Sequence, residues 1–259
     1  MLDSPLRQGL NTIKLGGKEF DFFYEDRGAK VTFVTFAAAI GAKTPNYPIF
    51  SSRLVAGRIG ANYLAFADTA SGGSEALTTF WHMGTAAVPT REIVPQIVRK
   101  AEVEGSGESL LFFGSSAGGF AALNYGAHFP GSAVLVMNPR INLLNEPKHM
   151  PRYVPVAFPG EDLTTRIREL PYDQAKHYSE PHGNHVFYMQ NMQDPNYKRH
   201  HYAHFEKAVR GRDDVTFVTG NWGDGHVVPP RPLFEGLLSR VVASAPDWEA
   251  VSLDGLPNL

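Results

Sequence analysis

Short apolar segments alternate with helical segments along the chain, and this alternation restricts the fold more than any other feature of the sequence. The expected strands are 31–36, 63–67, 110–113, 133–137, 185–189 and 215–218. Helices are expected at 89–104, with Thr90 as the N-cap, and at 117–129, 202–210 and 233–245. Apolar strands that alternate with helices form a mostly parallel sheet with helices on both faces. The sequence therefore predicts an α/β fold, preceded by a hairpin that turns at Gly16 and Gly17.

The segment 140–183 interrupts this alternation. It holds an expected helix at 161–170 and no convincing strand. A connection of this length predicts an insertion, or lid, over the ends of the strands. No linker-like composition separates it from the rest, so the 259 residues are expected to form a single domain, 1–259. The tail after Pro246 is expected to lie at the periphery.

Charge and composition exclude several classes of function. The chain has 24 basic and 26 acidic residues and a net charge of -2, which argues against nucleic acid or an acidic membrane as the main partner. Cysteine is absent, so there is no disulfide, no thiolate metal site and no cysteine nucleophile. The longest apolar run, 31–42, is too short to span a membrane. With no signal-like start either, we expect a cytoplasmic protein.

The most informative motif is Gly-x-Ser-x-Gly at 114–118, where an apolar strand runs directly into a helix. A nucleophile elbow needs this strand–turn–helix context, because Ser116 must occupy a strained turn while Gly114 and Gly118 let the strand and helix approach. The helix N-terminus then favours negative charge. The alternative is a glycine-rich turn that binds phosphate or only packs, but the dinucleotide pattern is missing. Ser115 is the competing serine, and it would break the register of the glycines.

This elbow resembles that of the α/β-hydrolase superfamily, and the resemblance covers about 31–245. The family places its catalytic residues in the order serine, acid, histidine, with the acid after a later strand and the histidine after the last one. By this order His226, in a glycine-rich loop, corresponds to the base. Asp194, the first acidic residue beyond strand 185–189, corresponds to the acid that orients the imidazole.

Other assignments of the acid remain open at this point. Asp224 is close to the histidine in sequence, Asp173 lies in the insertion, and Asp194 is alternatively a helix cap or a turn residue before a proline. Some members of the family place the acid one strand earlier. There this chain has Asn138, which carries no charge.

The resemblance also implies an oxyanion hole made of two backbone N–H groups. One belongs to Ala117, directly after the serine, and the other to the loop after strand 31–36, where we expect Ala38. Many esterases have glycine in that loop, whereas this chain has three alanines at 37–39. Alanines are less flexible, and a binding protein of this fold that has lost catalysis is therefore an alternative.

Two further features are candidates for binding. Trp81, in the segment Trp-His-Met-Gly at 81–84, and Trp222 lie in loops where they could stack on a substrate or plug the core. His200 and His204 have the spacing of a zinc-protease motif but lack its glutamate, which favours a solvated helix face over a metal site.

Together these features predict a serine hydrolase that cleaves a carboxylic ester with a Ser-Asp-His triad and needs no cofactor and no metal. The expected partner is a small-molecule or glycan ester, and the oligomeric state is not predicted. The long elbow helix, the run Tyr-Met-Gln-Asn at 188–191 and the loop of Trp81 also resemble a bacterial branch associated with surface glycans and accessory secretion. That resemblance implies, as the alternative, an O-acyltransferase or O-acetyl esterase acting on carbohydrate.

Overall fold

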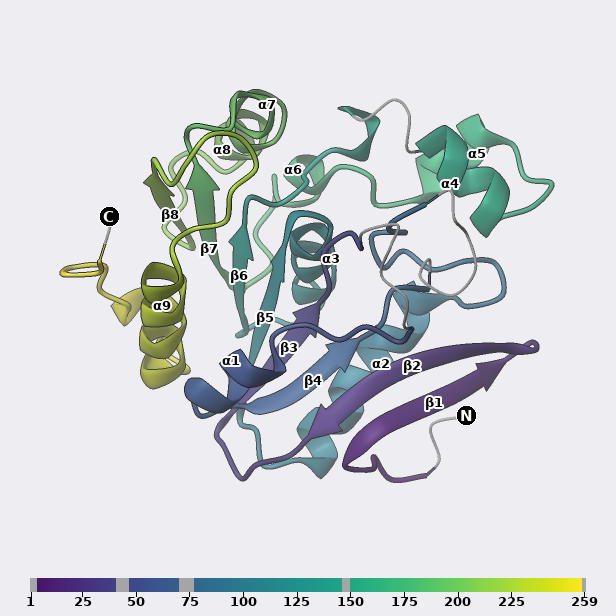
Figure 1. The fold of residues 1–259 in the computed structure, drawn as a ribbon, viewed down its shortest axis with the longest axis horizontal. Coiled ribbons are helices and arrows are strands. Elements are labelled where there is room, and N and C mark those ends of the chain that lie inside the picture. Colours follow the sequence, from purple (N-terminus) through teal and green to yellow (C-terminus); the bar gives the residue numbers. More distant parts are fainter. Residues whose placement is uncertain (1–3, 41–46, 70–76, 146–149, 258–259) are drawn as a thin grey trace.

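The computed structural model describes residues 4–40, 47–69, 77–145 and 150–257. These residues form one eight-stranded sheet in the order β1-β2-β4-β3-β5-β6-β7-β8 (Figure 1). The strands are β1 (Gly9–Leu15), β2 (Lys18–Glu25), β3 (Val31–Phe36), β4 (Asn62–Phe66), β5 (Ser109–Ser115), β6 (Ala133–Met137), β7 (His185–Asn191) and β8 (Val215–Gly220). The hairpin β1–β2 is antiparallel, and β3 to β8 are mutually parallel. The predicted α/β fold class is confirmed.

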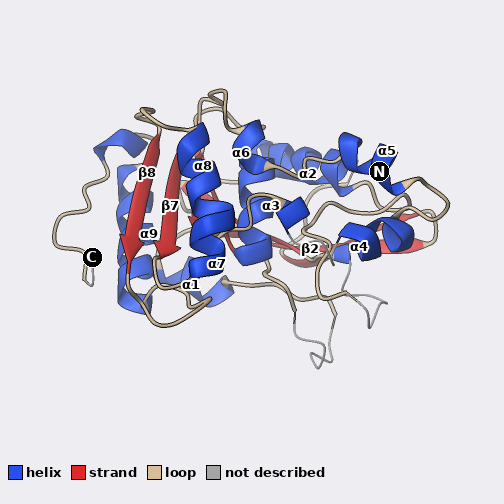
Figure 2. Ribbon diagram, turned by 90° about the horizontal axis from the view of Figure 1, so that it is seen from above, coloured by secondary structure: helices blue, strands red, loops and turns tan. Residues whose placement is uncertain are grey.

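Helices cover both faces of this sheet (Figure 2). They are α1 (Arg53–Arg58), α2 (Thr90–Glu104), α3 (Ser116–Gly126), α4 (Met150–Ala157), α5 (Leu163–Glu169), α6 (Gln174–His177), α7 (Pro195–Tyr197), α8 (Ala203–Ala208) and α9 (Arg231–Ser244), with the short 3-10 helices η2 (Leu143–Asn145) and η4 (Trp248–Ala250) and the π-helix η3 (Lys198–Tyr202). Side chains of α2, α3 and α8 share one apolar cluster, and those of α1 and α9 share a second on the opposite face.

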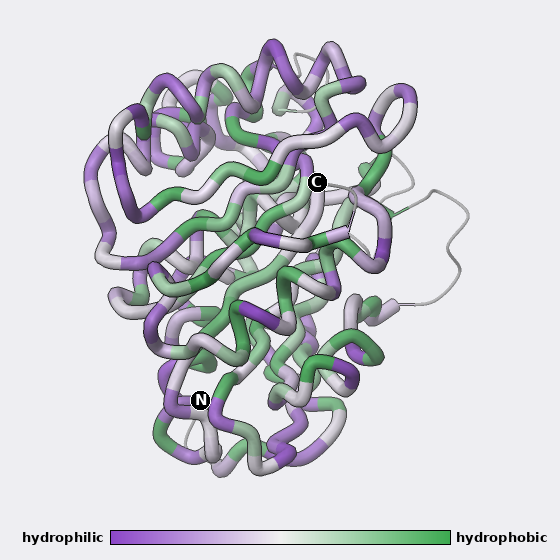
Figure 3. The backbone as a smooth tube through the Cα atoms, turned by 90° about the vertical axis from the view of Figure 1, so that its left-hand side faces the viewer, coloured by the Kyte–Doolittle hydropathy of each residue, from purple (hydrophilic) through white to green (hydrophobic). Residues whose placement is uncertain are grey.

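The strand β5 shows why the sheet is buried on both sides. Leu110 and Phe112 belong to the cluster of α2, α3 and α8, whereas Leu111 and Phe113 belong to the cluster of α1 and α9. Successive side chains of a strand point to opposite faces, so a wholly apolar strand needs a helical layer on each side. Figure 3 shows the same arrangement, with hydrophobic segments inside and hydrophilic segments at the surface.

Two local expectations are wrong. Thr90 is the first residue of α2 rather than its N-cap, and its hydroxyl donates instead to the carbonyl of His82. The tail after Pro246 is not peripheral, because Trp248 and Leu256 are buried in the core cluster beside α9. An apolar residue in a tail is enough to dock it when a helix leaves an apolar face uncovered.

The insertion contributes α4, α5 and α6 and packs beside the start of α3. Tyr153 of α4 shares an apolar cluster with Ala117 and Phe120, which are in the first two turns of α3. The segment therefore lies near the carboxyl edge of the sheet, and its role as a lid stays a prediction. In the described part of the chain, no helix combines the length and apolar character needed to cross a bilayer.

Candidate active site

The turn between β5 and α3 places Ser116 in a strained conformation. Ser116 is the first residue of α3, and its φ of 50° lies in the left-handed region that non-glycine residues rarely adopt. Its side chain is partly exposed at the carboxyl end of the central strand. The strand–turn–helix arrangement expected for Gly-x-Ser-x-Gly is therefore present around Ser116.

The flanking glycines are required by close backbone contacts. A Cβ on Gly114 would lie 2.2 Å from the carbonyl of Gly118, and a Cβ on Gly118 would lie 2.3 Å from the carbonyl oxygen of Phe36. A Cβ on Gly119 would likewise lie 2.8 Å from the Cβ of Pro139. Any side chain at these positions would push the helix away from the sheet.

The loop after β8 brings His226 to the same edge of the sheet. His226 Nδ1 lies 3.0 Å from Asp194 Oδ2, the carboxylate that follows β7. Because a carboxylate only accepts, Nδ1 carries the proton, and Nε2 of the neutral ring is the nitrogen able to accept another. The histidine side chain is 39% exposed and the aspartate side chain only 5%. This pair has the arrangement of a general base and its orienting acid.

Asp194 also caps a helix, so its two carboxylate oxygens have different partners, and its role as the triad acid stays a prediction. Its Oδ1 accepts the backbone N–H of Tyr197 at 3.0 Å, while Oδ2 meets the imidazole. Among the described residues, the carboxylate bonded to His226 is that of Asp194 and not that of either alternative acid. Asp224 has an exposed side chain, and Asp173 caps α6 and bonds to His204.

Two buried asparagines hold the histidine loop. Asn191, at the end of β7, donates to the carbonyls of Gly223 and Gly225 at 2.6 and 2.8 Å and accepts the N–H of Trp222 at 3.0 Å. Asn138, after β6, accepts the N–H of Asn191 at 2.7 Å and donates to the carbonyl of Val227 at 2.8 Å. Asn138 occupies the place where some members of the superfamily have the acid, and here it anchors the loop instead.

Tyr197 lies between the serine and the histidine. Its hydroxyl is 3.1 Å from Ser116 Oγ, and either oxygen can be the donor. Its ring stacks on His226 with 3.9 Å between centroids. Within the described ranges, this phenol and not the imidazole is the hydrogen-bond partner of the serine hydroxyl. If the serine hydroxyl is the donor, reaction at Ser116 requires its proton to turn from Tyr197 toward His226; if the phenol donates, the serine proton is already available to His226.

A second histidine also packs against the tyrosine. The ring of His201 is 4.7 Å from that of Tyr197, and its Nδ1 accepts the N–H of Ile141 at 3.1 Å. His201 is only 1% exposed, and burial lowers its pKa to about 3. It is therefore neutral over the physiological range and packs against the tyrosine as an uncharged ring.

The two expected oxyanion donors lie beside the elbow. Ala117 is buried in the first turn of α3, where backbone N–H groups have no intrahelical partner. Ala38 is half-buried in the loop after β3. That loop contacts the elbow directly, because a Cβ on Gly118 would also lie 2.9 Å from the carbonyl oxygen of Ala37.

The two tryptophans differ in their surroundings. Trp81 is 1% exposed and packs edge-on against Tyr153, with ring centroids 5.8 Å apart, so the structure does not present its indole to a substrate. Trp222 is half-buried in the loop of His226, and its Nε1 has no hydrogen-bond partner among the residues described. A substrate contact at Trp222 stays a prediction.

His200 and His204 do not form a pair. His204 Nε2 bonds to Asp173 at 3.0 Å, which ties α8 to the insertion, and the backbone carbonyl of His200 accepts from Asn145. In the described segments, no group of three or more histidine and acidic side chains is arranged to hold a metal ion.

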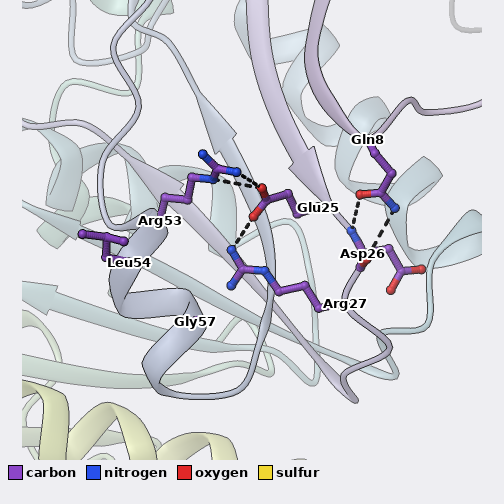
Figure 4. Close-up of a pocket in the computed structure, with 7 residues that line it drawn as sticks. All are labelled: Gln8, Glu25, Asp26, Arg27, Arg53, Leu54 and Gly57. Atoms are coloured by element: carbon purple, nitrogen blue, oxygen red, sulfur yellow. Dashed lines mark hydrogen bonds and ion pairs between the residues drawn. The ribbon is translucent and has the colours of Figure 1, made fainter.

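A separate pocket of about 650 Å³ lies between the hairpin and α1 (Figure 4). Arg27 and Arg53 both bond to the carboxylate of Glu25 there, and these bonds, that of Arg53 first, lower the pKa of Glu25. β4 and β3 separate β2, which borders this pocket, from β5, which leads into the elbow. Within the pocket, Glu25 is paired with Arg27 and Arg53.

No family model matches the chain, and a search of curated proteins found no match. Among solved structures, it is similar to the capsule O-acetyltransferase of Neisseria meningitidis serogroup A, with 16% identity, a TM-score of 0.63 and coverage of 87% of this chain and 91% of that one. It is also similar to the Glycosylation Associate Protein (Gap123) complex from Streptococcus agalactiae, with 14% identity, a TM-score of 0.59 and coverage of 84% and 42%.

A third similar structure is an esterase of Pyrococcus furiosus, with 12% identity, a TM-score of 0.57 and coverage of 93% of this chain and 91% of that one. Sequence identities this low establish a common fold and nothing finer. The strand order, the elbow after β5 and these likenesses agree, and the chain has the α/β-hydrolase fold.

Proposed function

We propose that this protein is a serine-dependent acyl-transfer enzyme that cleaves a carboxylic ester. The observation that carries the proposal is the arrangement of Ser116, in its strained turn, with a histidine and its acid: Tyr197 contacts both Ser116 and His226, and His226 lies 3.0 Å from Asp194. A nucleophile, a base and an orienting acid in this order are the parts that acyl transfer needs.

In the first step, Ser116 Oγ attacks the ester carbonyl carbon and its proton passes to His226 Nε2. The N–H groups of Ala117 and Ala38 hold the oxyanion of the tetrahedral intermediate. The ester C–O bond then breaks, and His226 returns the proton to the departing alcohol, which leaves an acyl group on Ser116. Asp194 stabilises the imidazolium that forms in between.

In the second step, water or another hydroxyl attacks the acyl-enzyme and gives its proton to His226. The bond from the acyl carbon to Ser116 Oγ breaks, and the same proton returns to the serine. Tyr197 is compatible with both steps, because its hydroxyl can donate to Ser116 Oγ and leave the serine proton for His226.

The direct test is labelling with a fluorophosphonate probe, followed by mass spectrometry of the modified peptide. We expect wild type to be labelled at Ser116, Ser116→Ala to be unlabelled, and Ser115→Ala to be labelled like wild type. Ser115 is a matched control because it is the adjacent residue in the same turn. Folded wild type that is not labelled would refute the enzyme and favour a binding protein of this fold.

Acyl transfer to a carbohydrate is the second candidate. The likeness to a capsule O-acetyltransferase supports it, and a histidine mutant of that enzyme has been solved in complex with CoA. The test supplies acetyl-CoA or a simple acetyl ester with and without an oligosaccharide acceptor. An acetylated sugar without faster release of acetate indicates transfer, whereas acetate release that ignores the acceptor indicates an esterase.

A further inference from the structure

The buried segment Trp81–Gly84 has no role in the proposed reaction, yet its backbone is strained. Trp81 and His82 have φ values of 50° and 56°, and each is only 1% exposed. A non-glycine residue in this region costs about 1–3 kcal/mol and persists only when its surroundings hold it there. Two consecutive strained residues in the core therefore indicate a position that the rest of the molecule enforces.

Two helices hold the backbone of His82. Its carbonyl oxygen accepts the hydroxyl of Thr90, the first residue of α2, at 2.7 Å and the hydroxyl of Tyr125, near the end of α3, at 2.6 Å. Tyr125 is itself fully buried. The helix that begins with the elbow thus helps to fix His82.

The imidazole of His82 reaches the loop that follows β3. Its Nε2 lies 3.0 Å from the carbonyl oxygen of Ala37, and because a carbonyl only accepts, Nε2 carries the proton and donates. The ring also packs edge-on against Phe36, with centroids 5.2 Å apart. His82 therefore contacts both residues that lead into Ala38.

Holding the Ala37 carbonyl also fixes the direction of the Ala38 N–H. The two groups belong to one planar trans peptide, in which they point in opposite directions. While His82 donates to the oxygen, the peptide cannot flip and turn that oxygen toward a developing oxyanion. The first turn of α3 lies against the same carbonyl at Gly118, so the plane is confined from two sides.

We infer that His82 is a positioning residue that aims the Ala38 N–H into the oxyanion hole. The inference rests on the proposed function, and it explains how a loop of alanines can serve where many esterases use glycine. Electrostatic stabilisation of this kind works because its donors are oriented before the reaction. His82 provides that orientation without touching the substrate.

The experiment compares His82→Gln with His82→Met. The two side chains have the same length and the same backbone cost, but only glutamine keeps an N–H donor. Loss of a whole oxyanion donor costs roughly 100- to 1,000-fold in kcat, and we expect a misaimed donor to cost about 10- to 100-fold in His82→Met. We expect His82→Gln to stay within about threefold of wild type, and KM for a p-nitrophenyl acetate substrate to stay within about twofold in both.

Trp248→Phe is the control for general destabilisation. In wild type, Nε1 of the buried Trp248 donates to the carbonyl of Gly131 at 2.8 Å. The variant therefore also loses one N–H···O=C bond, but it should keep wild-type kcat. His82→Asn is a second test variant, because asparagine tolerates positive φ yet is too short to reach Ala37. We expect it to lose kcat as His82→Met does.

The outcomes separate the inference from the proposed function. Wild type that is not labelled by a fluorophosphonate at Ser116 refutes the function itself. A different result refutes the role of His82 alone: wild type is labelled, but kcat is the same in folded His82→Gln as in a folded variant without the donor. That variant is His82→Met or His82→Asn, whichever folds. A loss of kcat in Trp248→Phe as large as in His82→Met would also refute it, because the effect would then follow stability.

Discussion

Replacing Asn191 by alanine should loosen the histidine loop, and the structure allows the effect to be worked out. The asparagine side chain is fully buried and makes three short hydrogen bonds to the backbone of the loop that carries His226. Each such bond contributes about 0.5–1.5 kcal/mol, and the groups left without partners are buried in part. We therefore expect Asn191→Ala to lose about 2–4 kcal/mol of unfolding free energy.

For a domain of this size, where 1 kcal/mol shifts Tm by about 2 °C, that loss lowers Tm by roughly 4–8 °C. The catalytic effect should exceed the stability effect, because a shift of about 1 Å in a reacting group can cost roughly 100-fold. We expect fluorophosphonate labelling of folded Asn191→Ala to slow by about 10- to 100-fold. Asn191→Asp should be less stable still, because it turns a carboxylate toward the two carbonyls of Gly223 and Gly225.

Asn11→Ala is the matched control. Its amide also makes three hydrogen bonds to backbone, to Arg7 and Gly9, but on the exposed edge strand β1. We expect it to lose about 1 kcal/mol or less and to be labelled at the wild-type rate. If Asn191→Ala is labelled as fast as Asn11→Ala well below both melting temperatures, the Asn191 amide does not position the histidine.

Three further outcomes are expected. Asp194→Asn should lower kcat by about 10,000-fold in a p-nitrophenyl ester assay. Asp224→Asn should leave kcat unchanged, and the reverse result would identify Asp224 as the triad acid. Tyr197→Phe keeps the ring stacked on the imidazole but loses one hydrogen bond to the nucleophile. Fluorophosphonate labelling should therefore slow by about two- to tenfold. Faster labelling would contradict this expectation and show that the phenol restrains the serine. Because the folded-state pKa of His201 is lowered to about 3, the unfolded chain binds its proton first as pH falls below about 6.5. Stability measured by urea unfolding should then fall by about 1.4 kcal/mol per pH unit from this group between pH 6 and 4, and His201→Gln should remove that part of the slope.

The elbow is the part of the site that could be read directly from the sequence. Gly114, Ser116 and Gly118 are constrained by sterics within five residues of chain, so their identities report the geometry. The alternation of apolar strands and helices is also local, and it was sufficient for the fold class. His226 and Asp194 were located by the order of residues in the superfamily, which no local pattern in this chain would have supplied.

Local sequence patterns do not reveal contacts between residues that are far apart in the chain. Tyr197 bonds to a serine 81 positions earlier, and His82 bonds to an alanine 45 positions earlier. A tyrosine or a buried histidine has many possible partners, and its sequence neighbours do not select one. Trp81 shows the same limit, because an indole in a loop suits a substrate or a core equally until packing places it.

The sequence by itself therefore determined the sheet, the strained serine and the candidate nucleophile, since each follows from sterics and apolar periodicity over a few residues. Only the tertiary structure decided which acid faces His226, what the serine hydroxyl bonds to, and how the alanine loop is held. Those relations depend on the packing of β3, β5, β7 and β8 and their loops at one edge of the sheet, and that packing is a property of the whole chain.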